Sequence, residues 1–566
     1  MKPFTLAQLL PAAVFAISIP AAGAEAGREP AYDLAVAYQH RALDNPAAYI
    51  PPQCYTKTED AAGVARNPCY VCHTSALRPN YVDDAALQLS YDFSEFAAIN
   101  RWRNLFQDRS ARVAAIGDAE ILDYIRTDNY RDEAGLPRLA RTLAAPPALW
   151  DANANGRWDG YLPDAGFHFD EDGFDRASAG DYTGWRAFAY YPFPGTFWPT
   201  NGSTSDVLIR LPEAFRRDQK GRFDPLVYKT NLAIVEALVR ECDIPIDSVD
   251  ERRLGGVDID KDGKIGRASQ VSYDWAPAAG RQMWYVGQAH DLQKKGRLRA
   301  AAGLYPEGTE FLHSVRYIDP REDGEIRLAP RLKELRYARK DVWLNYPNLR
   351  AIADAEIKER RDFPERLRGV LGDHERGVSN GKGWVFAGFI EDAAGELRPQ
   401  TYEELVFCVG CHGGIGATRD SIFSFDRKLG DGAFRRGWYH WSQRGLKGLP
   451  DPRRKDGRPE YAFYLEQNGA GDEFRANSEV LQRFFGADGA LDPVQLLALR
   501  NDISTLLWPS PQRALQLNKA YKAIVETQAF VQGRDATVVP PYSVHEAVVP
   551  GAATGIPREL VAERLQ

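Results

Sequence analysis

Methionine is nearly absent from this chain of 566 residues: apart from Met1, only Met283 is present. Cysteine is scarce as well, with six residues. Basic residues are not in excess, because 71 Lys and Arg face 78 Asp and Glu and the net charge is −7. This balance excludes the polybasic surface of a nucleic-acid-binding protein. The chain also lacks the signatures of a catalytic triad, a phosphate-binding glycine loop and a dinucleotide site.

Long hydrophobic runs are confined to the N-terminus. Lys2 precedes an apolar stretch over residues 6–19, and small residues follow it up to Glu25. This pattern predicts a signal peptide at residues 1–24, with cleavage before Glu25. A membrane anchor is the alternative, but the run is short for a span of about 20 residues. No cysteine lies near the cleavage site and no later segment is apolar enough to cross a bilayer, so we expect a periplasmic protein without a membrane span or lipid anchor.

Four of the six cysteines form two pairs with the same spacing, and a histidine follows each pair. The motifs are Cys69-Tyr70-Val71-Cys72-His73 and Cys408-Val409-Gly410-Cys411-His412. Two thiols at this spacing lie on one side of a helical turn and can form thioethers to haem, while the adjacent histidine binds the iron. A four-cysteine zinc site and a redox disulfide are the alternatives, and neither explains the two histidines. The motifs therefore predict two covalently bound haems c, with His73 and His412 as proximal ligands.

These two motifs make the chain resemble a dihaem c-type cytochrome of the large, exported type. More distantly, it resembles the bacterial dihaem cytochrome c peroxidases, whose chains are shorter and hold their haems closer in sequence. The resemblance implies electron transfer between periplasmic redox partner proteins. It also implies a peroxidase-like or oxygen-activating oxidoreductase as the alternative, in which one haem has an open site.

The scarcity of methionine limits the sixth ligand of each iron. Met283 can serve at most one haem, so bis-histidine coordination or an open face is expected. We favour His440, whose aromatic neighbours suit a haem wall, and His313, which lies in an apolar stretch. His545, near the C-terminus, is the next choice. The remaining histidines of the chain are His40, His168, His290 and His374.

The two other cysteines, Cys54 and Cys242, are predicted to form a disulfide, because an oxidising compartment disfavours two spare thiols. The bond would tie the first haem segment to the middle of the chain.

Two acidic loops between the haem motifs resemble the start of an EF-hand loop. The first contains Asp258, Asp260 and Asp262, and the second contains Asp151, Asn153 and Asn155. Oxygen ligands at positions 1, 3 and 5, followed by glycine at position 6, are typical of calcium loops, although Ser269 stands where the first loop should have its bidentate glutamate. The prediction is structural calcium, and the alternative is a pair of solvated acidic turns.

The sequence divides the mature chain into three segments and predicts an α+β fold. Residues 25–145 hold the first haem c, residues 146–330 predict short strands and long loops with the calcium sites, and residues 331–566 predict helices and hold the second haem c. Helical haem-binding segments therefore flank a loop- and strand-rich middle. Helices are expected at 84–107, 117–144, 331–370, 477–485, 492–506 and 511–530.

Electron transfer is the leading interpretation, because two haems in one exported chain suit the passage of electrons between partners. The oxidoreductase is the alternative, although the sequence names no catalytic acid or base for it. A calcium-braced binding or scaffold protein ranks last. The basic segment 435–458 is interpreted as a solvated face, with docking of an acidic redox partner or of haem propionates as the alternative.

Overall fold

The computed structural model describes residues 32–39, 41, 43–82, 84–196, 198–468, 477–561 and 565. The expected signal peptide at 1–24 lies outside these residues, and so does His40. Within the described ranges, no helix combines the length and the apolar character that a membrane span requires.

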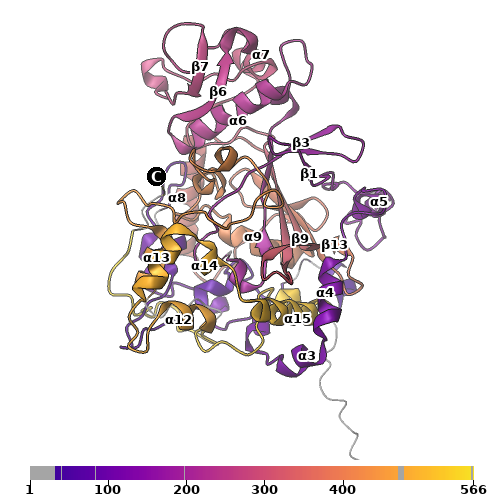
Figure 1. Ribbon diagram of the computed structural model, residues 1–566, viewed down its shortest axis with the longest axis vertical. Coiled ribbons are helices and arrows are strands. Elements are labelled where there is room, and N and C mark those ends of the chain that lie inside the picture. Colours follow the sequence, from indigo (N-terminus) through magenta and orange to yellow (C-terminus); the bar gives the residue numbers. More distant parts are fainter. Residues whose placement is uncertain are drawn as a thin grey trace, which may run out of the picture.

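A large antiparallel sheet runs through the centre of the molecule (Figure 1). Its strand order is β1-β2-β3-β5-β8-β9-β12-β11-β10, with β13 paired to β12 and β4 to β8. Its longest strands, β8 (Glu310–Pro320) and β9 (Ile326–Lys340), form a hairpin that is buried along most of its length. The other strands are β1 (His168–Phe169), β2 (Phe174–Arg176), β3 (Tyr182–Ala187), β4 (Thr204–Ser205), β5 (Leu208–Arg210), β10 (Gly372–Asp373), β11 (Gly377–Ser379), β12 (Trp384–Glu391) and β13 (Leu397–Pro399).

Helices from both ends of the chain cover this sheet. α4 (Asp118–Arg126) and α15 (Pro511–Thr527) pack beside β8 and β9, and α9 (Tyr402–Cys411) packs against β11 and β12. The remaining helices are α1 (Leu34–Gln39), α2 (Cys69–Cys72), α3 (Ser110–Ala115), α5 (Arg138–Leu143), α8 (Tyr346–Asp362), α10 (Ser424–Arg427), α11 (Glu460–Gln467), α12 (Ser478–Phe484), α13 (Pro493–Asn501) and α14 (Ser504–Leu507). The described chain is therefore mixed α+β.

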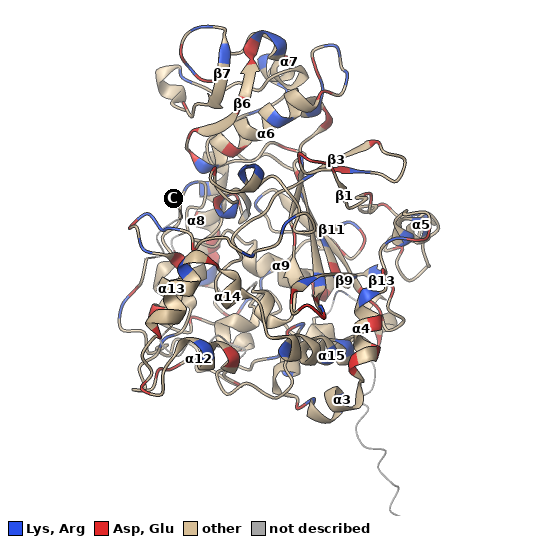
Figure 2. Ribbon diagram, viewed as in Figure 1, with Lys and Arg blue, Asp and Glu red and all other residues tan. Residues whose placement is uncertain are grey.

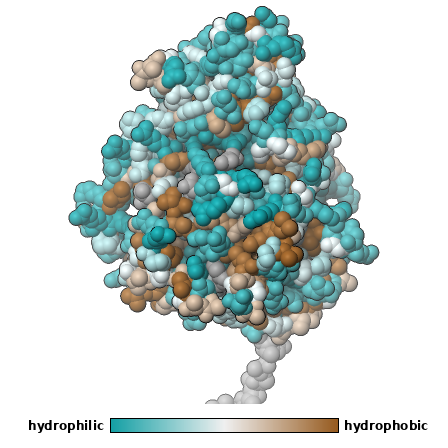
Figure 3. Space-filling view, turned by 60° about the vertical axis from the view of Figure 1, so that its left-hand side comes forward, coloured by the Kyte–Doolittle hydropathy of each residue, from teal (hydrophilic) through white to brown (hydrophobic). Residues whose placement is uncertain are grey.

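An upper lobe, at the top of Figure 1, contains α6 (Pro225–Arg240), α7 (Gln288–Lys294) and a separate pair of strands, β6 (Ile244–Asp250) and β7 (Arg267–Val271). Asp224 caps the start of α6 by accepting hydrogen bonds from the N–H groups of Leu226 and Val227. Most of α6 is buried, as expected for a helix that is apolar on nearly all sides. In Figure 3 the outside of this lobe is mainly hydrophilic, whereas hydrophobic side chains gather on the body below it.

Three of the expected helices are confirmed: 477–485 corresponds to α12, 492–506 to α13 and α14, and 511–530 to α15. The helix expected at 84–107 is wrong, because this segment contains only short 3-10 turns. The expected helix at 117–144 forms only in part, as α4 and α5. The first motif itself lies in α2, which has only four residues.

The helix expected at 331–370 is also wrong in its first part, where β9 runs instead. This charge-rich stretch was expected to be helical, but Lys333 and Glu334 are almost completely buried within the sheet. The sheet therefore continues past residue 330 as far as β13, while the middle segment contains the long helix α6.

The helix that carries the second motif, α9, has a well-defined start. Thr401 accepts a hydrogen bond from the N–H of Glu404, and the Glu404 carboxylate accepts one from the N–H of Thr401, which together form a capping box. The same carboxylate forms a buried ion pair with Arg398 at 2.8 Å. One glutamate therefore fixes both the start of α9 and the end of the strand before it.

Replacing Glu404 with Ala should lower the free energy of unfolding by about 3–5 kcal/mol, because Arg398 would stay buried without its carboxylate. Denaturant unfolding followed by tryptophan fluorescence measures this loss. The control is Glu325→Ala, which removes the exposed partner of Arg327 and should leave the midpoint unchanged. Equal effects of the two substitutions would contradict the assigned role of Glu404.

Candidate functional site

The two CxxCH segments lie against each other, although their histidines are 339 residues apart in sequence (412 − 73). The N–H of Ala417 donates a hydrogen bond to the carbonyl oxygen of Cys72 at 3.2 Å. The backbones approach so closely that a Cβ on Gly416 would lie 1.9 Å from the carbonyl oxygen of Thr74. Glycine is therefore required at this crossing.

Asp84 connects the first motif to this crossing. Its Oδ2 lies 3.2 Å from Nδ1 of His73, and the N–H of Gly416 donates to both carboxylate oxygens at 3.1 and 3.2 Å. A carboxylate that accepts the Nδ1 proton fixes the ring and leaves Nε2 as the metal-binding nitrogen. Asp84 thus holds the His73 ring in the orientation that a metal ligand would need and ties it to the second motif.

His412, at the C-terminus of α9, is held in a similar way. Its Nδ1 donates a hydrogen bond to the carbonyl oxygen of Ser421 at 2.7 Å, and its ring packs against Phe386 and Phe423. Burial lowers the pKa of His412 to about 4, so the ring is neutral at pH 7. This ring also presents Nε2, the nitrogen that an iron ligand needs.

A cavity of about 590 Å³, here called the first cavity, adjoins the first motif and is lined by Cys69, Cys72 and His73. Its volume falls within the range of roughly 300–1,000 Å³ for cofactor pockets. Apolar and aromatic walls fit a porphyrin, and arginines fit its two propionates. The wall and rim residues include Ile50, Leu87, Phe93, Phe363, Leu367, Arg360, Arg366 and Arg368.

A second cavity, of about 100 Å³, lies beside Cys411. It shares Gln53 and Thr196 with the first cavity, so the two spaces adjoin. The donor set of the second motif fits a haem, but this volume is too small for one unless side chains move.

Largely buried charges line the second cavity: Glu334 and Arg336 come from β9, and Arg534 comes from the segment after α15. Arg336 and Arg534 both pair with Glu334, at 2.9 and 2.7 Å. Burial alone would raise the pKa of Glu334, but these two cations overcome that effect and lower it to about 2. Sequence reasoning missed all three residues: Glu334 and Arg336 come from the stretch 331–370 that was expected to be helical, and Arg534 lies beyond the helix expected at 511–530.

The expected sixth ligands lie in different settings. Both ring nitrogens of His440 are engaged, since Nε2 lies 2.7 Å from Oδ2 of Asp206 and Nδ1 lies 2.7 Å from Oγ of Ser442. His313 is on β8, paired in register with Arg336 of β9. Burial lowers the pKa of His313 to about 4, and the charges of Arg336 and His412 add to the shift. The structure thus places His313 close to the second motif and gives His440 other partners.

The other candidates lie outside both cavities. The Nε2 of His545 is 3.0 Å from the hydroxyl of Tyr91, and this tyrosine, not the histidine, lines the first cavity. Met283, His168, His290 and His374 line neither cavity.

The expected disulfide between Cys54 and Cys242 is wrong, because every cysteine is a free thiol. Cys54 lines the first cavity and influences the pKa of Cys72 there. Cys242 follows α6 in the upper lobe, where Arg240 and Glu236 are its neighbours. The two cysteines therefore lie in different parts of the fold, Cys54 beside the first motif and Cys242 in the upper lobe.

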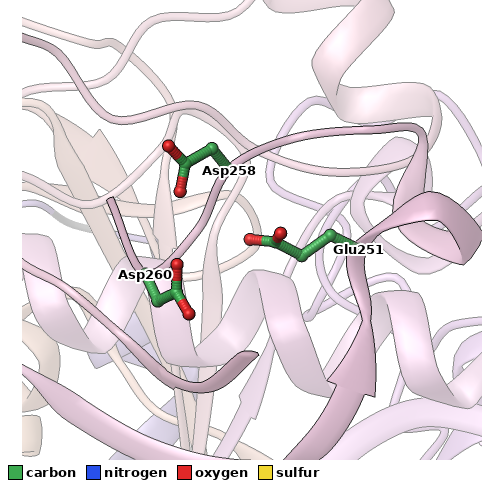
Figure 4. A group of neighbouring side chains, drawn as sticks. All are labelled: Glu251, Asp258 and Asp260. Atoms are coloured by element: carbon green, nitrogen blue, oxygen red, sulfur yellow. The ribbon is translucent and has the colours of Figure 1, made fainter. Parts of the chain in front are cut away.

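The first acidic loop gathers three carboxylates (Figure 4). Ligand oxygens of Glu251, Asp258 and Asp260 all lie within 4.8 Å of one another, and Asp262 is not part of this group. Glu251 is buried and accepts hydrogen bonds from the N–H groups of Ile259 and Gly266 at 2.6 and 2.8 Å. Glu251 precedes the loop, so an EF-hand pattern read forward from Asp258 could not reveal it.

Two further properties of this loop concern its charge. Oδ1 of Asp258 is buried and accepts no hydrogen bond in the described structure. Burial and the neighbouring carboxylates Asp262, Glu251 and Asp258 raise the pKa of Asp260. A cation bound between these carboxylates would offset both effects.

The second acidic loop satisfies its own polar groups. Asp151 accepts hydrogen bonds from the N–H groups of Asn155 and Gly156. The side-chain amides of Asn153 and Asn155 donate to Asp159 at 3.0 and 2.9 Å. Among the described residues, the structure does not gather this loop into a group of three carboxylates.

The basic segment 435–458 is partly neutralised by nearby acids. Arg436 pairs with Asp247 at 2.9 Å, and Asp456 pairs with Arg454 and Arg458. Figure 2 shows acidic and basic residues interleaved over the fold. These pairs favour the interpretation of the segment as a solvated face.

The comparisons with known proteins correct the family predicted from the sequence. The family described as "-like lipoprotein" matches residues 38–502. An "Uncharacterized lipoprotein" of Aquifex aeolicus (strain VF5) is 34% identical over 544 residues, which cover 87% of this chain and 86% of the relative. No solved structure matches. The resemblance to dihaem c-type cytochromes and dihaem cytochrome c peroxidases was therefore wrong as a family assignment, because it rested on ten residues.

In the haem-free protein, iodoacetamide should alkylate Cys69 and Cys411 roughly a thousandfold more slowly at pH 8 than it alkylates glutathione. Burial raises the pKa of both thiols to about 12, so the reactive thiolate is scarce at pH 8 and its fraction still rises above pH 10. Mass spectrometry of each peptide, from pH 7 to 10, measures the rates. The urea-unfolded chain is the control, and a rate that levels off near pH 9 in the folded protein would contradict the burial of these thiols.

Proposed function

The chain belongs to this "-like lipoprotein" family, and from that premise we propose that it is an exported redox protein. In this proposal it binds one haem c at Cys69, Cys72 and His73 and another at Cys408, Cys411 and His412, and it transfers electrons between periplasmic partner proteins. The observation that carries the proposal is the direct contact of two CxxCH segments beside two adjoining cavities. The description of the family as lipoproteins supports export.

The hydrogen bonds of both histidines support iron binding. Asp84 and the carbonyl of Ser421 engage Nδ1 of His73 and His412, which orients each ring before a metal binds. Bound haem supplies one-electron redox chemistry, whose potential depends on the axial ligands, on nearby hydrogen bonds and on burial. The protein contributes the orientation of the rings, the exclusion of water by its aromatic walls and the arginines that neutralise propionates.

The contact between the motifs supports electron transfer rather than two independent haem sites. Ala417 and Cys72 are joined by a hydrogen bond, so a short path through the protein connects the second motif to the first. For the second iron we propose His313 as the sixth ligand, because it is buried, neutral at pH 7 and close to His412. The engaged nitrogens of His440 argue against the same role for that residue.

Expression in a periplasm that matures c-type cytochromes should give two covalently bound haems per chain, counted from the pyridine haemochrome spectrum. The double variant Cys69→Ala/Cys72→Ala should retain one haem, because the thioether bonds at the first motif cannot form. Cys54→Ala and Cys242→Ala are matched controls that should retain two. A chain that matures without haem would contradict the proposal.

We also propose that the first acidic loop binds calcium through Glu251, Asp258 and Asp260, with Asp262 close by to add negative charge. The support is the cluster of three carboxylates and the unpaired Oδ1 of Asp258. Hard cations prefer carboxylate oxygens. The ion would brace the connection between β6 and β7 in the upper lobe.

Calcium at millimolar concentration should raise the thermal midpoint by a few degrees over protein in EDTA, because a ligand that binds only the folded state stabilises it. Asp260→Asn should abolish this rise, whereas Asp151→Asn in the second loop should preserve it. The rise should also fade as the pH falls, since protons compete for Asp260, whose pKa is raised. An unchanged midpoint in the wild type would contradict a calcium site.

A further inference from the structure

The first cavity offers a strong iron ligand on one side only. Among the described residues that line it, His73 is the only histidine and none is a methionine. His545 lies behind Tyr91, and the Tyr91 hydroxyl donates to the carbonyl of Thr56 at 2.8 Å. Apart from His73, the described lining of this cavity therefore holds neither of the two side chains that usually complete a six-coordinate haem c.

The remaining groups in this lining that are able to bind iron are mostly engaged elsewhere. Asp92 pairs with Arg360. Glu356 pairs with Lys382 at 2.7 Å, and Glu359 pairs with Arg366 at 2.9 Å. The thiol of Cys54 faces the cavity, but burial raises its pKa, so it is present as the weakly binding thiol and not as the thiolate. Tyr49 is the one further phenol in this lining.

One polar side chain, Gln53, belongs to the linings of both cavities. Its Oε1 is buried without a hydrogen-bond partner in the described structure. Buried amides normally find partners. Oε1 itself can only accept, but the N–H2 group of the same side chain can donate a hydrogen bond to a small molecule bound at the iron, and such donors influence how a distal pocket treats its ligand.

The two motifs therefore differ. His313 lies near His412 of the second motif, whereas the first motif adjoins the larger cavity, in whose described lining His73 is the only histidine. We propose that the haem of the first motif has an open face that binds small uncharged diatomic molecules, with Gln53 as the group that stabilises the bound ligand. The inference rests on the proposed haem attachment and adds a ligand-binding site to the electron-transfer role.

Carbon monoxide is the probe, used on the reduced protein that carries two haems. One carbon monoxide should bind per chain, and the oxidised protein should contain one high-spin and one low-spin iron by electron paramagnetic resonance. The variant Cys408→Ala/Cys411→Ala, which keeps only the first haem, should still bind carbon monoxide. Cys69→Ala/Cys72→Ala, which keeps only the second haem, should not.

Gln53→Leu tests the distal role of the amide. Loss of the donor should move the C–O stretching band of the bound ligand to higher frequency and change its dissociation rate several fold. Thr196→Val, at the other residue shared by the two cavities, is the matched control and should leave the band in place. If the C–O stretching frequency were the same in Gln53→Leu as in the wild type, the proposed role of Gln53 would be wrong.

Three substitutions test whether the face is occupied by the protein itself. Cys54→Ser, Tyr49→Phe and His545→Gln should leave the spin state of the first haem unchanged. Conversion of a low-spin to a high-spin iron by any of them would overturn the inference. The inference would also be overturned if the protein carried two haems and neither bound carbon monoxide. A haem count of zero would instead refute the proposed haem attachment, on which the inference rests.

Discussion

The close crossing of the two motif segments is the contact on which the arrangement of the candidate site depends. At Gly416 the backbone comes so near to Thr74 that even one methyl group would collide with its carbonyl. Asp84 lies at the same crossing, where its carboxylate accepts hydrogen bonds from the N–H of Gly416 and from the ring of His73. The cavities beside the motifs share Gln53 and Thr196 in their linings, so two cofactors bound there would be neighbours despite the separation of the motifs in sequence.

The region beside the second motif contains largely buried charged side chains. Arg336, Arg534 and Glu334 lie beside the second motif in surroundings where an isolated ion would be strongly destabilised. They are tolerated because each cation shares the same carboxylate. Glu334 and Arg336 owe their positions to β9, in which alternate residues face the same side, whereas Arg534 comes from the segment after α15 and pairs with Glu334. The same strand pairs Arg336 with His313 and so brings a histidine towards the second motif.

The two motifs adjoin cavities of very different volume, and this difference suggests different roles for the two proposed haems. The first motif adjoins a spacious cavity with one histidine in its described lining, which would suit exchange with small molecules. The second motif adjoins a much smaller cavity and has His313 nearby, which would suit an electron relay. The upper lobe lies apart from this chemistry. Its acidic loop depends on Glu251, a residue outside the loop, so any cation held there would stabilise the connection between β6 and β7 and leave the iron ligands unchanged.

The sequence by itself determined features that depend on covalent spacing: the thiols and histidine of each motif, the start of the acidic loop and the amphipathic helices near the C-terminus. Ten motif residues did not determine the family. Only the tertiary structure decided that the two motifs meet and that Asp84 links them. It also brought Glu251 to the acidic loop and kept Cys54 and Cys242 apart. It also placed buried charges in β9, where a helix was expected. The physical reason is that short spacings fix which atoms are neighbours, whereas contacts between distant segments follow from which surfaces the whole chain buries together.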